Sequence, residues 1–305
     1  MKPNVALALA SGGPRGFAYI GAIEELQARG YTITSVAGAS AGSLVGGIFA
    51  AGRLQPFKQW LFGLDPVKVM ALMDVSVSKN YLVKGERVIN EIKSFVPDVN
   101  IEDLPIPFTA VATDLYTGEE VVFREGPLFN AIRASISIPS MFKPVKWKGR
   151  TLVDGGMVNT FPLNRVQRTP GDILVGFNVN QIDAAQIQGF LDSRAAIARE
   201  KESEHNLLAR IQAGMHQRQL EASASNSWIP VGADDNFASI LQRSFGIMNC
   251  SLSRFAIELT PPDVLASLPY DSYHGVYGYS HAQEIAALGR QLMADALDQY
   301  EQKNA

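Results

Sequence analysis

The sequence predicts an α/β protein in which helices cover both faces of a central, mainly parallel β-sheet. Apolar segments of strand length alternate with helical segments over the first part of the chain, a pattern typical of βαβ units with right-handed crossovers. Glycine-rich loops follow the first two expected strands, at the sheet edge where open α/β folds place ligands. The chain has 305 residues, 47% hydrophobic and 19% charged, which suffices for a large core.

The N-terminal part of the chain supplies two strands and two helices. Val5–Leu9 is a short apolar run that predicts a buried strand, and the loop Ser11–Gly16 follows it. Residues 17–30 carry apolar side chains at helical spacing and end on a glycine suited to a helix C-terminus. Ile33–Gly38 is the second expected strand, and Ser43–Ala51 the second helix.

The middle of the chain adds strands to the same sheet. Phe108–Thr113 and Glu120–Phe123 are apolar and β-branched, and the turn residues between them predict a hairpin. Thr151–Val153 and Ile173–Asn178 are two further expected strands. Because one sheet can hold all of these, we predict that residues 1–180 form a single domain.

The last third of the chain changes in composition. Residues 181–234 are rich in Gln, Ala, Ser, Glu and Asn, which predicts a polar, helical and mobile insertion. Residues 235–305 are expected to pack back on the core as a helix, a strand and a helix. These are the apolar segment Phe237–Leu252, the segment Arg254–Pro262 closed by two prolines, and the amphipathic segment Ser280–Gln302.

Charge and cysteine content limit the class of protein. The net charge of −3 gives no reason to expect a nucleic-acid partner. The single cysteine, Cys250, excludes an internal disulfide, fits a reducing compartment and is expected to be a buried apolar side chain. The apolar run Val5–Ala10 is too short for a signal peptide, and no apolar run approaches the length of a membrane span. We therefore expect a cytoplasmic protein, either free or peripheral to a membrane.

Gly38-Ala39-Ser40-Ala41-Gly42 matches the pattern G-x-S-x-G of a nucleophilic serine. A sharp turn from strand to helix exposes such a serine, and glycines on either side remove the Cβ atoms that would clash there. The dipole of the following helix points at charge that develops near the hydroxyl. The alternative is a helix start made of small residues that packs closely on the sheet.

The glycine loop Ser11–Gly16 follows the first strand and should reach the same sheet edge as Ser40. Its backbone N–H groups are candidates for an oxyanion hole. A phosphate-binding loop is the competing interpretation, but the loop has neither the GK[ST] ending of a P-loop nor the pattern G-x-G-x-x-G.

A nucleophilic serine needs a proton acceptor. His205 and His216 fall in the polar insertion and are expected to be solvated, whereas His274 or His281 could complete a Ser–Asp–His triad in chain order. The nucleophile follows the second strand, however, which does not suit the layout of α/β-hydrolases.

Asp154 in the run LVDGG is the better candidate for the acceptor, because it ends a strand and could face Ser40. Its ordinary pKa near 3.9 makes it a weak base, and burial would raise that pKa. An Asp-Gly-Gly run is also common turn chemistry, so both interpretations stay open on the residues alone.

Three motifs in this order, SGGPRG, GASAG and DGG, resemble the patatin-like phospholipase family. The resemblance extends through LVKGERV, FTAVATDLYTGEEVVFREG and AIRASISIPSMFKPV to the small bacterial patatin-like proteins of the RssA kind, and it covers roughly residues 3–180. It implies a three-layer α/β/α patatin-like fold and a serine acyl hydrolase that uses a Ser–Asp dyad, without histidine, on phospholipids or lysophospholipids.

The resemblance also implies a role for each motif residue. Ser40 would attack the ester carbonyl, and Asp154 would accept the serine proton and later activate the water that releases the acyl group. The supporting residues are the oxyanion loop of Gly12, Gly13, Arg15 and Gly16, the nucleophile elbow of Gly38 and Gly42, and the acid loop of Gly155 and Gly156.

The loop departs from the family pattern at two positions. Ser11 stands where the family usually has glycine, which adopts left-handed dihedrals more easily. Pro14 occupies a variable position and, without an N–H group, cannot be an oxyanion donor.

Two further segments are expected near the site. Ala131–Pro139 should pack as a scaffold beside it, and Trp60–Met73 is either core packing or an apolar lip for lipid entry at a membrane surface. The sequence has no EF-hand-like acidic loop, so we expect neither a calcium requirement nor another cofactor. Two alternatives remain: a non-catalytic lipid-sensing or regulatory protein, and a protease or thioesterase that uses the same dyad.

Overall fold

The computed structural model describes residues 2–72, 85–182, 237–270, 272–273 and 278–304. Two compact units divide the chain: Met1–Gln181 together with Gly246–Ala305 form one, and Ile182–Phe245 form the other. The fold described below is that of the first unit. Most of the predicted polar insertion, together with His205, His216 and His274, lies outside the described residues.

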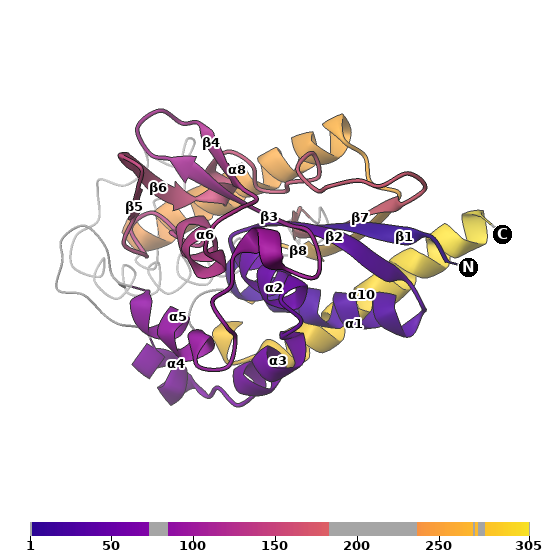
Figure 1. Ribbon diagram of the computed structural model, residues 1–305, viewed down its shortest axis with the longest axis horizontal. Helices are drawn as coiled ribbons and strands as arrows, with labels where there is room; N and C mark the ends of the chain where they lie inside the picture. Colours follow the sequence, from indigo (N-terminus) through magenta and orange to yellow (C-terminus); the bar gives the residue numbers. More distant parts are fainter. Residues whose placement is uncertain (1, 73–84, 183–236, 271, 274–277, 305) are drawn as a thin grey trace, which may run out of the picture. The chain divides into compact units, whose positions relative to one another are not determined.

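A β-sheet in the order β5-β6-β3-β2-β1-β7-β8, with β4 paired to β3, forms the centre of this unit (Figure 1). Its strands are β1 (Asn4–Leu9), β2 (Thr32–Ala39), β3 (Phe108–Asp114), β4 (Glu120–Phe123), β5 (Val145–Trp147), β6 (Arg150–Asp154), β7 (Ile173–Gln181) and β8 (Val264–Pro269). The run from β3 to β8 is parallel, whereas β4 and β6 pair antiparallel with β3, and β5 pairs antiparallel with β6. This confirms the predicted mainly parallel sheet and the β3–β4 hairpin.

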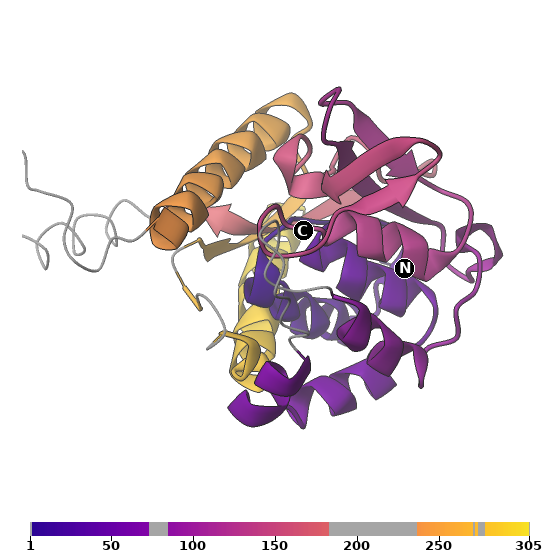
Figure 2. The same ribbon diagram turned by 90° about the vertical axis from the view of Figure 1, so that its left-hand side faces the viewer.

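Helices cover both faces of the sheet. The described helices are η1 (Gly13–Phe17), α1 (Ala18–Ala28), α2 (Ala41–Ala50), α3 (Leu54–Phe62), α4 (Pro66–Leu72), α5 (Glu86–Lys93), η2 (Ile101–Asp103), α6 (Leu128–Ser135), η3 (Gly155–Met157), α8 (Phe237–Leu259) and α10 (Ala282–Lys303). Helices α1, α2 and α10 share the larger core, while Ala256 and Ile257 of α8 pack on a smaller core on the other face (Figure 2). Val5–Leu9 is fully buried because side chains on both faces of β1 are covered.

The predicted strand Arg254–Pro262 is wrong. Helix α8 continues through this segment to Leu259, and the strand β8 begins only at Val264. Cys250 and Ser253 are buried three residues apart, which places them on one helical face. The two prolines therefore follow a helix rather than close a strand. The burial of Cys250 agrees with the expectation for an apolar cysteine.

Two other boundaries differ from the prediction in a way that matters for the site. The second helix begins at Ala41, directly after Ser40, rather than at Ser43. The glycine loop does not stay irregular but winds into the 3₁₀ helix η1 from Gly13 onward. Both helix N-termini consequently lie at the carboxyl end of the strands that precede them, β1 and β2.

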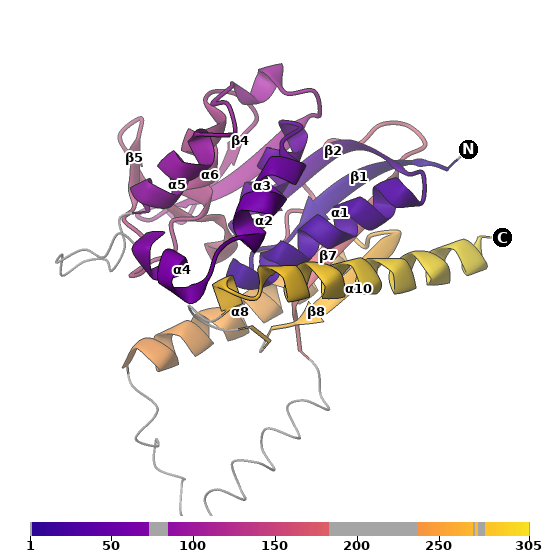
Figure 3. The same ribbon diagram turned by 90° about the horizontal axis from the view of Figure 1, so that it is seen from below.

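Helices α1 and α10 lie side by side, as Figure 3 shows. A Cβ atom added to Gly289 would lie 2.0 Å from the carbonyl oxygen of Ala18, and one added to Gly21 would lie 1.9 Å from that of Ala286. The two helices therefore pack backbone against backbone at these glycines.

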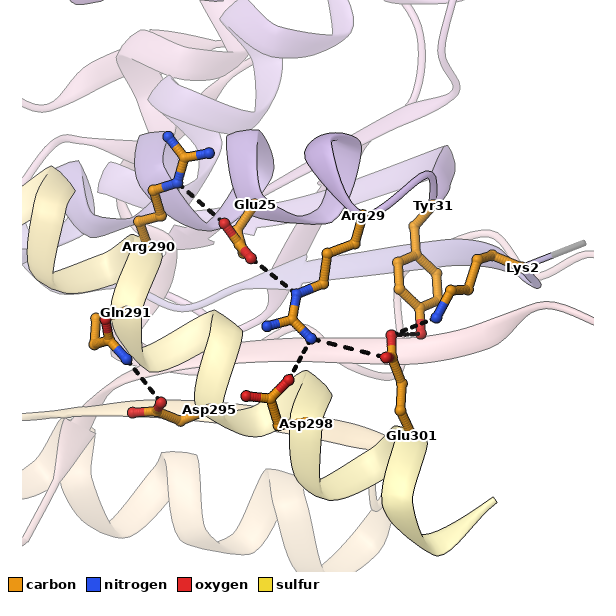
Figure 4. A network of polar contacts seen from close by, with 9 residues as sticks. All are labelled: Lys2, Glu25, Arg29, Tyr31, Arg290, Gln291, Asp295, Asp298 and Glu301. Carbon is orange, nitrogen blue, oxygen red and sulfur yellow. Dashed lines mark hydrogen bonds and ion pairs between the residues drawn. The ribbon is translucent and has the colours of Figure 1, made fainter. Parts of the chain in front are cut away.

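Ion pairs also link α10 to α1 and to the residue Lys2 near the N-terminus (Figure 4). Arg29 binds Asp298, Arg290 binds Glu25, and Lys2 binds Glu301. Because these pairs are at least partly exposed, each contributes little free energy, and the close helix contact dominates the packing. The Lys2–Glu301 pair also places the two ends of the chain close together (Figure 4).

We expect Gly289→Ala to lower the free energy of unfolding by about 2 kcal/mol, because the new methyl group would overlap backbone atoms of α1. In an open helix the same change would stabilise by up to about 1 kcal/mol. Urea denaturation measures the difference, and Gln291→Ala on the exposed face of α10 serves as the control. An unchanged or higher midpoint for Gly289→Ala would contradict the close packing.

Within the described residues, no helix combines the length and apolar character needed to cross a membrane.

Candidate active site

Ser40 occupies a sharp turn between β2 and α2. Its backbone dihedrals are φ 52° and ψ −120°, a left-handed conformation that is strained for a residue with a side chain. The turn is held by hydrogen bonds on both sides: the Ser40 N–H donates to Ser135 Oγ at 2.9 Å, and its carbonyl oxygen accepts from the Ser43 hydroxyl at 2.7 Å. Ser135 belongs to the segment Ala131–Pro139, so this segment does support the turn.

The glycines that flank Ser40 are required by close backbone contacts. A Cβ atom on Gly38 would lie 2.3 Å from the carbonyl carbon of Gly42. One on Gly42 would lie 2.3 Å from the carbonyl oxygen of Leu9, at the end of β1. The turn is therefore closed tightly on itself and against the first strand, as the predicted nucleophile elbow needs.

The Ser40 hydroxyl donates a hydrogen bond of 2.5 Å to Asp154 Oδ2. Asp154 is the last residue of β6, 114 positions later in the chain, and both side chains are buried. The structure thus brings together the two residues that the sequence singled out as nucleophile and proton acceptor.

The Asp154 carboxylate is fixed and desolvated. Its Oδ1 accepts a 2.7 Å hydrogen bond from the Gly156 N–H, which leaves Oδ2 for Ser40. Burial raises the pKa of Asp154 to about 7, while the hydrogen bonds from Ser40 and Gly156 act in the opposite direction. A carboxylate with a pKa near 7 is a competent base at neutral pH. Gly155 and Gly156 suit this loop, since a Cβ on Gly155 would lie 2.2 Å from the carbonyl oxygen of Val111.

The four residues predicted for the oxyanion loop have different surroundings. Gly13 lines the same cavity as Ser40 and has φ +57°, a conformation that favours glycine. Gly12 packs against Val179, and Gly16 packs against Ala41, where added Cβ atoms would approach to 2.1 Å and 2.5 Å. Of the predicted set, Gly13 is the residue whose backbone faces the cavity.

Arg15 anchors the loop through its side chain. The buried guanidinium donates to the carbonyl oxygen of Val179 at the end of β7 and to that of Tyr270 after β8. These bonds tie η1 to the carboxyl ends of two neighbouring strands. The role of Arg15 is therefore to hold the loop in position.

Ser11 fits the loop without left-handed dihedrals, because it is not among the described non-glycine residues with positive φ. Its N–H donates to the Thr160 carbonyl oxygen, and its own carbonyl oxygen accepts from Asn180. A Cβ on Gly156 would lie 2.6 Å from Ser11 Oγ, so the loop and the acid turn are in direct contact. The serine at this position joins the two loops rather than distorting the first.

An apolar cavity of about 120 Å³ opens onto Ser40. We call it the acyl pocket; its walls come from α2, α3, α4, α5 and the residues after α6, and they include Leu44, Phe57, Trp60, Leu61, Leu64, Val69, Leu72, Val88, Ile92, Ile136, Ile138 and Phe142. Over its described part, the segment Trp60–Met73 has both buried and exposed apolar side chains. Leu61 and Val69 are buried in the wall, whereas Val67 and Met70 on α4 point outward, 78% and 53% exposed.

Several residues of the acyl pocket were not predicted from the sequence, and two of them, Ala41 and Tyr279, carry polar groups. Ala41 is the first residue of α2 and, like Gly13 in η1, has an N–H without an acceptor inside its own helix. Tyr279 enters from the C-terminal part of the chain; a Cβ on Gly13 would lie 3.9 Å from its hydroxyl oxygen. Ala41 could have been found from its place after the nucleophile, but no local pattern marks Tyr279.

Among the described residues, the histidine alternative receives no support. His281 pairs with Glu284 at 3.1 Å, and the acceptor of the Ser40 hydroxyl is Asp154. In the part of the chain that the structure describes, no group of three or more His, Cys, Asp or Glu side chains is arranged to hold a metal ion.

Comparison with known proteins adds a family likeness. The model of the patatin-like phospholipase family matches residues 7–166. An uncharacterized NTE family protein of Mycobacterium tuberculosis is 33% identical and is aligned over 98% of this chain and 93% of its own length. Patatin-like phospholipase domain-containing protein 7 of Mus musculus is 26% identical over 62% of this chain and 14% of that protein.

Among solved structures, VipD from Legionella pneumophila is similar with a TM-score of 0.44 and 15% sequence identity. The alignment covers 96% of this chain and 67% of that one.

Proposed function

Because the chain belongs to the patatin-like phospholipase family, we propose that it is a serine acyl hydrolase that cleaves carboxylic esters of lipids. The observation that carries this proposal is the 2.5 Å hydrogen bond from the Ser40 hydroxyl to the buried carboxylate of Asp154 at the end of an apolar pocket.

In the first half of the reaction, Ser40 Oγ attacks the ester carbonyl carbon while its proton passes to Asp154 Oδ2. The tetrahedral intermediate then collapses, the C–O bond to the alcohol breaks, and the proton moves from Asp154 to the departing alkoxide. In the second half, Asp154 takes a proton from water, the resulting hydroxide attacks the acyl-enzyme, and Ser40 recovers its proton as the fatty acid leaves. The same carboxylate thus serves as base and acid in each half.

The negative oxygen of the intermediate is stabilised by groups that face Ser40. The N–H groups of Gly13 and Ala41 belong to two helix N-termini, whose dipoles also favour negative charge. A Cβ added to Gly16 would lie 2.5 Å from the Cβ atom of Ala41, so these N-termini lie against each other. We assign the oxyanion hole to Gly13 and Ala41, with Arg15 holding the loop in place.

The acyl pocket favours a lipid substrate. Its wall is formed almost entirely by aliphatic and aromatic side chains, which suit an acyl chain and offer few groups to recognise a peptide. The exposed Val67 and Met70 on α4 next to this pocket would favour contact with a membrane surface. Within the family we favour a phospholipase or lysophospholipase of the small bacterial RssA kind, cytoplasmic or peripheral to a membrane, that needs no metal.

The test of the proposal is labelling with a fluorophosphonate, followed by turnover of a panel of lipid esters with identification of the products by mass spectrometry. An activated Ser40 should form a covalent adduct and release fatty acid from a phospholipid or lysophospholipid. A wild-type protein that neither labels nor releases fatty acid would favour the lipid-sensing alternative. Faster turnover of acyl thioesters or peptides than of esters would favour the thioesterase or protease alternative.

Tyr279 is a further polar group near the oxyanion position. Burial and, to a smaller extent, the charge of Asp154 raise the pKa of its hydroxyl to about 12, while Arg15 lowers it, so the group stays a neutral donor. Its ring packs edge-on against Phe17 with centroids 5.8 Å apart, a contact that phenylalanine would keep.

We therefore expect Tyr279→Phe to lower kcat about 100-fold with little change in KM, because a donor to the transition state is removed while the apolar wall remains. Steady-state kinetics on a soluble ester measures both constants. The control is Tyr273→Phe, since the Tyr273 hydroxyl donates to Glu284 on the exposed side of the same region. Equal kinetics for the two variants would remove Tyr279 from the reaction.

A further inference from the structure

A second cavity lies beside the acyl pocket and has the opposite chemistry. It is a cleft of about 440 Å³ lined by residues of α5, α6 and the segment 143–146. Figures 1 and 3 show α5 and α6 close to β5, which begins within this segment. Four cationic side chains and one acidic side chain line the cavity; we call it the basic cleft, and its charged residues are Lys93, Arg133, Lys143, Lys146 and Glu86. The positive excess stands out in a chain whose net charge is −3.

Two of these cations, Lys143 and Lys146, have no acidic partner among the described residues. Lys93 pairs with Asp98 at 2.7 Å, whereas Lys146 donates to the neutral hydroxyl of Thr151. The Lys143 ammonium forms no ion pair with a described residue and is exposed. Even with Asp98 and Glu86 counted, the cleft keeps a positive excess that an anion could neutralise.

Arg133 is partly buried, whereas Lys143 and Lys146 are exposed. The Arg133 guanidinium donates to Ser137 Oγ at 2.7 Å and to the Lys143 carbonyl oxygen at 2.8 Å, so it lies between α6 and the segment 143–146. Burial lowers the pKa of Arg133, and Glu86 only partly offsets this. A partly desolvated cation gains most from a bound anion, because a hydrogen bond between charges is strong away from water.

The basic cleft shares its walls with the acyl pocket. Ile89 of α5 faces the cleft, whereas its neighbours Val88 and Ile92 face the pocket. Along the next segment, Phe142 faces the pocket and Lys143 the cleft. The two cavities are therefore neighbours, separated by α5 and the segment around Phe142.

A short path also links the cleft to the catalytic pair. Arg133 donates to Ser137 Oγ, and the Ser137 carbonyl oxygen accepts the N–H of Asp154 at 2.9 Å. Arg133 thus lies two hydrogen bonds away from the backbone of Asp154, and an anion bound by Arg133 would lie three away.

We propose that the basic cleft binds the phosphate group of an anionic lipid whose acyl chain occupies the acyl pocket. This inference rests on the proposed function and narrows it: the preferred substrates carry a phosphate with free negative charge, as in phosphatidic or lysophosphatidic acid. Neutral glycerides fill the acyl pocket but leave the cleft without a ligand.

Binding tests the proposal without turnover. Ser40→Ala protein is titrated with lysophosphatidic acid of short chain, below its micellar concentration, and with the monoacylglycerol of the same chain. Replacing Lys143 and Lys146 by glutamine should weaken lysophosphatidic acid about fivefold each and about 25-fold together, since an exposed ion pair contributes up to about that factor. Binding of the monoacylglycerol should not change. The lysophosphatidic acid preference should also shrink as sodium chloride is raised.

The control is Lys148→Gln, because Lys148 stacks on the Trp147 ring and does not line the cleft. Equal losses for both lipids, no loss for either, or the same loss in Lys148→Gln would overturn the proposal. Inorganic phosphate is the other arm: if it binds as tightly as lysophosphatidic acid, the cleft is a site for free anions, and the lipid assignment is wrong.

Kinetics separates this inference from the function on which it rests. In wild-type protein, kcat/KM for lysophosphatidic acid should exceed that for the monoacylglycerol, and the double lysine variant should remove the difference. If the wild type hydrolyses neither lipid, the proposed hydrolase is wrong, and the binding titrations still decide whether the cleft recognises the phosphate.

Discussion

Replacement of Ser40 by alanine is expected to lower kcat/KM for lipid esters by at least about 10⁴-fold, because the atom that attacks the carbonyl is lost. The fold should persist: the turn is held by backbone contacts of Gly38 and Gly42 and by the Ser40 N–H bond to Ser135, none of which uses the hydroxyl. Removal of the hydroxyl also leaves the Asp154 carboxylate with one donor fewer, so its pKa should rise further.

The measurements are the release of fatty acid and covalent labelling by the fluorophosphonate, both against Ser35→Ala as a control. Ser35 lies in β2, the strand that leads to Ser40, is equally buried, and donates to the Gln167 carbonyl oxygen away from the site. The control should label at the wild-type rate. Residual turnover of Ser40→Ala above about one hundredth of the wild type would show that another group carries the reaction.

The sequence was most informative where local chemistry and fold position coincide. The serine between Gly38 and Gly42 could be located because a strand, a tight turn and a helix leave a pattern within a few residues. The parallel sheet followed from the alternation of strands and helices. The residues around Asp154 left two interpretations open, a proton acceptor or an ordinary turn, because a carboxylate before two glycines is common in turns. The likeness to a family was needed to favour the proton acceptor.

Parts of the site formed by distant segments were not predictable in the same way. Tyr279 reaches the acyl pocket from the residues before α10, more than 230 positions after Ser40, and nothing in its local sequence marks that contact. Arg15 could be expected in the oxyanion loop, but its side chain lies against the carbonyl oxygens of Val179 and Tyr270, which only the arrangement of β7 and β8 brings there. The strand predicted at Arg254–Pro262 was wrong because apolar residues at short range fit a half-buried helix equally well.

We expect Asp154→Asn to lower kcat/KM by about 10³–10⁴-fold, because an amide cannot accept the serine proton. The wild type should show a kcat/KM that rises with pH and levels off above about 7, where the carboxylate of the free enzyme is ionised. The residual activity of the variant should lack this rise. A variant that keeps both the rate and the pH profile would exclude Asp154 as the base.

The same substitution should reveal the free-energy cost of keeping this base buried. The pKa of Asp154 is about 7 in the folded protein against an ordinary value of 3.8, so the folded state binds the proton more tightly. Stability is therefore lost as pH rises from about 4 to 7, and at 1.36 kcal/mol per pH unit the full loss is about 4 kcal/mol. Asparagine avoids that loss but gives up one of the two hydrogen bonds to the carboxylate, about 1 kcal/mol.

Asp154→Asn should consequently be more stable than the wild type at pH 8 and lose that advantage by about pH 4, where the wild-type carboxyl is protonated in the folded protein and little of its stability has been lost. Urea denaturation at the two pH values measures this crossing. Parallel stability curves would mean that the carboxylate is solvated and holds an ordinary pKa, and the proton transfer from Ser40 would then lack its driving force. The expected crossing ties the activity of the pair to its burial: the desolvation that destabilises the fold is what makes the carboxylate a base.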